Sequence, residues 1–325
     1  MEFPDAAPPP SHRVTGIAAM MFSVVIPLFN KAPHIAAAIN SVLAQTLSPD
    51  EIIVVDDGST DASAALAESF AGQQVMLIRQ ANQGVSAARN TGVAAARSSH
   101  VAFLDADDIW LPRHLETLQS LILQFPDAQL YSTLYEIHLG SNVFWPKSAY
   151  SYGFVGMVDD FFRRMAIGLS LVNSTTACVT RQAFFEVGGF PTNVKRGEDV
   201  VLWMKLSQKF TVAHSATITA VYNRNAVNRS ASLREQTAPG SLLYLQKFMA
   251  LPAASHLASA KLLFRQIAFY AAAGMREAGD FDGLTAIRRL AQQNNMPSLA
   301  LNIYLIGFVP PAVLSLARRF RHKSQ

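Results

Sequence analysis

The sequence has 325 residues, of which 50% are hydrophobic and 15% charged, whereas an average soluble protein has about 25% charged residues. This composition can bury a large core and excludes a wholly disordered chain, which needs low hydrophobicity and a high net charge. The single cysteine, Cys178, excludes a disulfide scaffold and is typical of a protein in a reducing compartment.

The net charge of +4 comes from one short segment near the end of the sequence. Arg318, Arg319, Arg321 and Lys323 lie within the last eight residues, and without them the formal charge of the remaining chain is zero. A neutral body lacks the basic face that nucleic-acid binding requires, so we expect no nucleic-acid partner.

Along the chain, an irregular start gives way to alternating strands and helices. Residues 1–20 contain a proline cluster and no apolar period, which predicts a disordered segment. Strands are then predicted at 22–28, 51–55, 75–78 and 101–104, and helices at 33–45, 61–70, 84–97 and 112–125. Nearly continuous apolar strands separated by helices predict an α/β fold with a mostly parallel sheet covered on both faces. Its ligand is expected beyond the carboxyl ends of the strands.

The pattern changes in the second half of the chain. Residues 131–156 are rich in aromatic and turn residues, which suits either an antiparallel extension of the sheet or a loop that covers the substrate. Beyond Ser241 the sequence shows only helical patterns. We therefore expect one domain over 21–235 and a helical extension over 236–325.

Carboxylates directly follow two of the predicted strands. Asp56 and Asp57 follow the second strand, and Asp105, Asp107 and Asp108 follow the fourth. Because the carboxyl ends of parallel strands share one edge of a sheet, both groups should converge where a ligand binds. Carboxylates held close together repel one another and favour a bound cation. Their oxygens suit a hard divalent ion completed by water and phosphate, and no Cys/His spacing indicates zinc.

Each of these carboxylates also has an ordinary structural explanation. The segment Asp56–Ser59 is a common turn sequence, because Asp forms Asx-turns and Gly accepts a positive φ. The acidic residues at 105–108 precede a helix and can cap it. Glu198 and Asp199 are predicted to open a helix, where acidic residues complement the helix dipole.

Five segments between Ser23 and Trp203 carry motifs that occur together in one known family. They are SVVIPLFN, EIIVVDDGSTD, NQGVSAARNTGVAAA, VAFLDADDIWLP and VGGFPTNVKRGEDVVLW, with a weaker match from Tyr222. In this order they resemble the catalytic domain of glycosyltransferase family 2, whose members are inverting sugar transferases of the GT-A fold. The resemblance implies that fold for this chain.

The resemblance also implies roles for individual residues. Those expected to line the nucleotide-sugar pocket are Pro27, Asn30, Asp56, Asp57, Arg89, Asn90 and Asp105. Asp107, together with Asp105, matches the DxD motif that holds Mn²⁺ or Mg²⁺, and Asp199 matches the general base. Glu198 and Trp203 are expected near the acceptor, with a buried core position as the alternative for Trp203.

By the same resemblance, the reaction is a nonprocessive, metal-assisted transfer of one sugar from a nucleotide-sugar donor, with Asp56 accepting a hydrogen bond from the base, usually uracil. The acceptor is a hydroxyl of a glycan or of a lipid-linked intermediate in bacterial cell-surface polysaccharide synthesis. The QxxRW motif of large polymer synthases does not occur in the sequence.

Two rival functions are compatible with parts of the sequence. A nucleotide-sugar-binding protein that has lost transfer is disfavoured because Asp107 and Asp199 are both present. A sugar-nucleotide pyrophosphorylase would need a glycine-rich, arginine-containing loop after the first strand, where this chain has Pro27–Lys31 without a glycine.

The last apolar segment, 299–317, is interrupted by Asn302 and by Pro310–Pro311. A spanning helix needs about 20 predominantly apolar residues, so a simple membrane span is not expected. An apolar helix followed by basic residues is typical of a segment that lies on an anionic membrane surface, and packing on the catalytic domain is the alternative. We expect a cytoplasmic protein in peripheral contact with the inner face of the cell membrane.

Overall fold

The computed structural model describes residues 22–72, 74–168, 171–226, 239–251, 256–311 and 313–314. Three sequence-based expectations lie outside these residues. They are the disordered segment over 1–20, the placement of the basic residues between Arg318 and Lys323, and the end of the weaker family match that begins at Tyr222.

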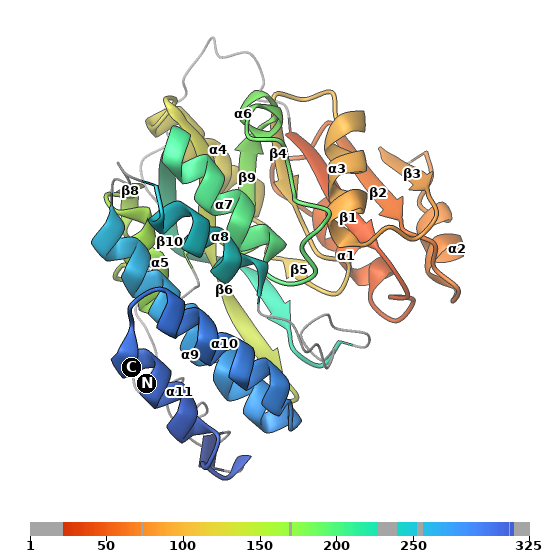
Figure 1. The fold of residues 1–325 in the computed structure, drawn as a ribbon. Helices are drawn as coiled ribbons and strands as arrows, with labels where there is room; N and C mark the ends of the chain where they lie inside the picture. Colours follow the sequence, from red (N-terminus) through yellow and green to blue (C-terminus); the bar gives the residue numbers. More distant parts are fainter. Residues whose placement is uncertain are drawn as a thin grey trace.

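Ten strands form one sheet through the described part of the chain (Figure 1), in the order β3-β2-β1-β4-β9-β6-β10-β5, with β7 paired to β6 and β8 to β10. The four strands β1 to β4 run parallel, as do β6 and β10, whereas β9 runs antiparallel between β4 and β6. The strands are β1 (Phe22–Leu28), β2 (Glu51–Asp56), β3 (Val75–Arg79), β4 (His100–Phe103), β5 (Ile109–Trp110), β6 (Ala128–Leu139), β7 (Asn142–Phe144), β8 (Val155–Met157), β9 (Ala177–Thr180) and β10 (Thr211–Asn223).

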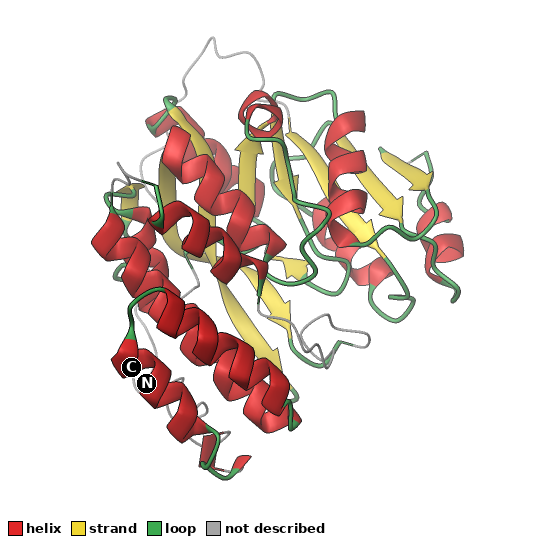
Figure 2. Cartoon of the chain, viewed as in Figure 1, coloured by secondary structure: helices red, strands yellow, loops and turns green. Residues whose placement is uncertain are grey.

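Helices cover both faces of this sheet (Figure 2). Buried residues of α1, α2 and α4 form one core with the sheet, and those of α3 and α5 to α11 form the other. The helices are α1 (Ile35–Leu43), α2 (Ser63–Glu68), α3 (Val85–Ala95), α4 (His114–Gln124), α5 (Phe161–Gly168), α6 (Arg181–Glu186), α7 (Glu198–Lys209), α8 (Gly240–Met249), α9 (Leu257–Ala278), α10 (Phe281–Gln293) and α11 (Pro297–Ile306).

The continuous apolar sequence of β1 follows from this double coverage. Successive side chains of a strand point to opposite faces, so Val25 joins the core under α3 while Val24 and Ile26 join the core under α1. Gly92 allows α3 to approach β1 closely, because a Cβ there would lie 2.4 Å from Cγ1 of Val25. The position of α3 therefore depends on one residue without a side chain.

The structure confirms the α/β fold with a mostly parallel sheet, and the predicted strands and helices of the first half appear with ends shifted by a few residues. The segment 131–156 does not form a single unit. Its first part belongs to β6, which lies inside the sheet, and only β7 and β8 add antiparallel strands. The helical character beyond Ser241 is also observed. Among the described helices, none combines the length and apolarity needed to cross a membrane.

Candidate functional site

The ends of β1 and β2 are joined by a loop network around Asn30. Pro27 is buried in β1 and pairs with Val55 of β2. Asn30 adopts a positive φ of 50° just after β1, and its side-chain oxygen accepts a hydrogen bond of 2.8 Å from the backbone N–H of Thr60. Its own N–H donates to Oγ of Ser59. These contacts fix the two strand ends relative to each other.

Asp56 and Asp57 are both buried at the end of β2 but differ in their partners. Oδ1 of Asp56 accepts one hydrogen bond of 3.2 Å, from the N–H of Ser59, which is the turn geometry that the sequence allows. Asp57 accepts from the side chain of Gln80 and from the backbone N–H groups of Gln83 and Gly84. Asp57 therefore holds the loop that leads into α3, which leaves Asp56 as the less heavily bonded of the two.

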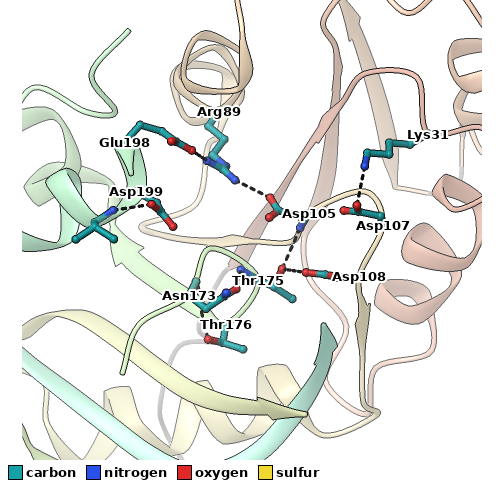
Figure 3. A network of polar contacts seen from close by, with 11 residues as sticks. Lys31, Arg89, Asp105, Asp107, Asp108, Asn173, Thr175, Thr176, Glu198 and Asp199 are labelled. Carbon is teal, nitrogen blue, oxygen red and sulfur yellow. Dashed lines mark hydrogen bonds and ion pairs between the residues drawn. The ribbon is translucent and has the colours of Figure 1, made fainter. Parts of the chain in front are cut away.

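The end of β4 carries Asp105 and Asp107, both partly exposed, and each pairs with a basic side chain (Figure 3). Oδ2 of Asp107 lies 2.6 Å from Nζ of Lys31, a residue from the loop after β1. Oδ1 of Asp105 lies 2.7 Å from Nη2 of Arg89 on α3. The two acidic residues thus face the loop after β1 on one side and α3 on the other.

Arg89 also connects this strand end to the start of α7. Its Nη1 lies 3.1 Å from Oε1 of Glu198, while its side chain is only 4% exposed. Gly197 precedes the helix with a φ of +73°, and a Cβ there would lie 2.8 Å from Oγ of Ser241. Asp199 follows in the first turn, partly exposed, with Oδ1 accepting a hydrogen bond of 2.7 Å from the N–H of Val200. One guanidinium therefore brings the acidic groups of β4 and α7 together.

The electrostatics of this group follow from burial. Burial alone would lower the pKa of Arg89, but Asp105 and Glu198 outweigh it and raise that pKa. Burial and, after it, the neighbouring Asp199 raise the pKa of Glu198 to about 7. Burial also raises the pKa of Asp199, with Arg89 opposing the shift. Glu198 and Asp199 therefore hold protons at a higher pH than exposed carboxyl groups do.

Asp108 is a structural member of the acidic cluster. It is buried, accepts a hydrogen bond of 2.9 Å from the N–H of Asn223 and another from the hydroxyl of Thr175, and burial, with Asp105 and Asp107, raises its pKa well above the ordinary range. The N–H of Asp105 donates to the same Thr175 hydroxyl at 3.5 Å. Thr175 therefore holds the loop after β4 through contacts with Asp105 and Asp108.

Sequence reasoning did not find Thr175 or Lys31. A usable signal for Thr175 exists, because the run Asn173–Thr176 is four polar residues between apolar neighbours, and Ser174, Thr175 and Thr176 are all buried. A polar run inside a buried segment indicates side chains that serve a polar site. For Lys31 we find no comparable signal, since its partner Asp107 lies 76 positions away.

The side chains of two predicted site residues, Asn90 and Trp203, make contacts within the protein. Both side-chain atoms of Asn90 bond to the backbone of Phe190, so its amide holds the loop that leads to α7, and its predicted nucleotide contact stays a prediction. Trp203 is fully buried against Phe103 and Phe190. An acceptor sugar cannot stack on a ring without exposed surface, so the core alternative holds for Trp203 and the acceptor contact is wrong.

A sequence profile of the family described as "Glycosyl transferase family 2" matches residues 23–188, about half of the chain. The chain belongs to glycosyl transferase family 2. This result confirms the family resemblance of the first four sequence segments and identifies the protein as a glycosyltransferase, whereas the fifth segment begins at Val187 and lies almost entirely beyond the matched residues.

Curated relatives match this family 2 chain over its first part. An uncharacterized glycosyltransferase of Nostoc sp. is 49% identical over 102 residues, covering 30% of this chain and 32% of the relative. A UDP-Glc:α-D-GlcNAc-diphosphoundecaprenol β-1,3-glucosyltransferase of Escherichia coli is 35% identical over 118 residues, covering 36% of this chain and 46% of the relative. The chain thus spans less than half the length of either relative.

Among solved structures, S. aureus TarS in complex with UDP-GlcNAc superimposes on this glycosyltransferase with a TM-score of 0.71. The alignment covers 93% of both chains at 17% sequence identity. At this identity the similarity establishes the GT-A fold and leaves the substrate undetermined.

We predict that Arg89→Gln lowers the free energy of unfolding of this glycosyltransferase by about 3–5 kcal/mol, because it leaves the largely buried Glu198 and the partly exposed Asp105 without their cation. Urea denaturation at pH 8, above the pKa of about 7 of Glu198, measures this loss. The matched control is Arg79→Gln, whose ion pair with Glu68 lies at the surface and contributes about 1 kcal/mol or less. Equal losses in the two variants would contradict the buried role of Arg89.

Proposed function

We propose that this glycosyltransferase is a nonprocessive, inverting enzyme that transfers one sugar from a UDP-sugar to a hydroxyl of a glycan or lipid-linked acceptor. The proposal is supported above all by Arg89, whose contacts to Asp105 and Glu198 bring two acidic groups from distant segments into one site. A leaving diphosphate needs a cation, which carboxylates can hold, and an incoming hydroxyl needs a carboxylate as its base, so the reaction uses acidic groups on two sides of the same sugar.

Asp199 is the general base of this proposal. The acceptor oxygen forms a bond to the anomeric carbon while the bond from that carbon to the diphosphate breaks, and Asp199 takes the hydroxyl proton. One of its oxygens accepts a hydrogen bond from its own helix, which orients the carboxylate, and the residue is partly exposed. Attack opposite the leaving group inverts the anomeric centre.

The donor is proposed to bind beyond the ends of β1, β2 and β4. Asp56 keeps hydrogen-bonding capacity for the base, since it accepts one bond where Asp57 accepts three. UDP is favoured as the nucleotide because the TarS structure contains UDP-GlcNAc and the E. coli relative is named for UDP-Glc. The same relative is named for a diphosphoundecaprenol-linked acceptor, which supports a lipid-linked acceptor in cell-surface polysaccharide synthesis here.

Asp105 and Asp107 fit Mn²⁺ or Mg²⁺ by the chemistry of their oxygens. No group of three or more His, Cys, Asp or Glu side chains in the described ranges could enclose a metal ion. Mg²⁺ commonly uses one or two carboxylates, with water and substrate phosphate as the other ligands, so two carboxylates are sufficient. When bound, the ion would stabilise the negative charge that develops on the leaving diphosphate. Lys31, which now neutralises Asp107, would have to release it.

The proposal is tested with Asp199→Asn and a panel of UDP-, GDP- and dTDP-sugars. We expect this variant to lose transfer by a factor of about 10²–10⁴ while it still binds the nucleotide, because only the proton acceptor is removed. Asp127→Asn, at the opposite edge of the sheet before β6, is the matched control and should keep full activity. Wild-type turnover in Asp199→Asn would refute the base assignment. Nucleotide release that needs added acceptor distinguishes a transferase from a protein that only binds the donor.

A second prediction concerns the cation. We expect Asp107→Asn to lose the part of UDP binding that depends on Mn²⁺, because a neutral amide is a weaker ligand for a hard cation. Thermal unfolding with UDP, with and without Mn²⁺, measures this, since a ligand at 100 times its Kd stabilises the folded state by about 2.7 kcal/mol. An unchanged Mn²⁺ effect in the variant would exclude Asp107 as a ligand.

A third prediction concerns pH. A carboxyl group must be ionised to act as a base, and burial raises the pKa of Asp199, so kcat/KM should rise with pH above the range in which an exposed aspartate ionises. Glu198→Gln removes the neighbouring charge and should shift this rise to lower pH. Profiles from pH 5 to 9 test the shift, with Glu116→Gln on α4 as a control. If Glu198→Gln and wild type show the same rise in kcat/KM, the rise does not come from the Glu198–Asp199 pair.

A further inference from the structure

The last described helix, α11, has two apolar faces, and the structure covers only one of them. The covered face packs against α9 and α10 and consists of Leu299, Ala300, Ile303 and Ile306. The other, which we call the outer face of α11, consists of Leu301, Tyr304 and Leu305 together with Phe308 in the turn after the helix, and these residues are 56%, 47%, 51% and 68% exposed. Figure 1 shows α11 at the periphery of the molecule, beside α9 and α10.

Three residues of the outer face share one side of the helix. Tyr304 and Leu305 lie three and four positions beyond Leu301, and Phe308 follows in the turn after Ile306. The rings of Tyr304 and Phe308 touch edge to face, with centroids 5.1 Å apart. A helix at a water-exposed surface normally carries charged residues on this side, whereas α11 contains no charged residue at all.

Two basic side chains contact α11, while the acidic residues of the neighbouring helix α10, Asp280 and Asp282, lie at its start. Nη2 of Arg265 on α9 donates to Oγ of Ser298 at 2.6 Å, and the guanidinium of Arg288 on α10 lies 5.5 Å from the ring centre of Tyr304. The sequence from 283 to 325 contains no Asp or Glu. Its basic residues include the cluster between Arg318 and Lys323, which begins ten positions after Phe308.

We infer that the outer face of α11 docks on an anionic lipid surface, and that the positive charge of the sequence after it strengthens the attraction. Apolar side chains flanked by basic residues fit the boundary between acyl chains and negatively charged headgroups. A second copy of this chain fits less well, because it would bring the same positive charge to the same contact. The inference concerns binding alone and does not depend on the transfer reaction.

The test is flotation of the full chain with vesicles of phosphatidylcholine alone or with 30% phosphatidylglycerol added. We expect binding to the anionic vesicles, and a loss of at least about tenfold in partition for Leu305→Gln with Phe308→Gln, because two apolar side chains no longer enter the bilayer. The matched control is Leu66→Gln with Leu123→Gln, two exposed leucines on α2 and α4, which should bind as wild type does. Circular dichroism checks that each variant is folded.

The charge contribution is tested separately. Arg318→Gln with Arg319→Gln should weaken binding to the anionic vesicles by about 25-fold, at about fivefold for each basic residue near the surface. Raising the salt concentration should weaken wild-type binding in the same direction. Absence of wild-type binding to anionic vesicles, or equal loss in the α2 and α4 control, overturns the inference. So does self-association, seen by analytical ultracentrifugation, that the α11 variant abolishes while vesicle binding is absent.

Discussion

A buried guanidinium imposes the main constraint on this glycosyltransferase. Arg89 keeps its charge in the interior, and such a charge is tolerated only when it is paired and hydrogen-bonded. Its two partners come from the end of β4 and from the start of α7, two segments that are far apart in the sequence. Pairing Arg89 therefore requires the sheet, α3 and α7 to meet at one place. The acidic groups to which we assign sugar transfer are assembled as a consequence.

Several contacts near Arg89 hold the sheet, α3 and the loop before α7 in place. The close approach of Gly92 to Val25 fixes the distance of α3 from the sheet. The amide of Asn90, the residue after Arg89, bonds to the backbone of Phe190 and fixes the loop before α7. Thr175 contacts both Asp105 and Asp108. Because side chains that position a site are themselves packed and bonded, the acidic groups are held in place before any donor binds.

The C-terminal helices connect the site to the surface of the molecule. α8 packs on α7, which begins with Glu198 and Asp199, while α9 and α10 carry α11 at the periphery. One face of each helix completes the core. α11 also exposes the apolar residues Leu301, Tyr304 and Leu305, so the same helical extension serves both the stability of the catalytic part and, in our inference, its location at a lipid surface.

The sequence by itself determined the α/β fold, the family and the placement of Asp56 and Asp105 after two strands at the same edge of the sheet, because apolar periodicity and motif order are local properties of the chain. The tertiary structure alone decided that Trp203 belongs to the core, that Asn90 bonds to Phe190 and that Lys31 pairs with Asp107. Each of these outcomes depends on which distant segments pack together. Burial and charge pairing between such segments are set by the packing of the whole chain and leave no pattern in the residues around them.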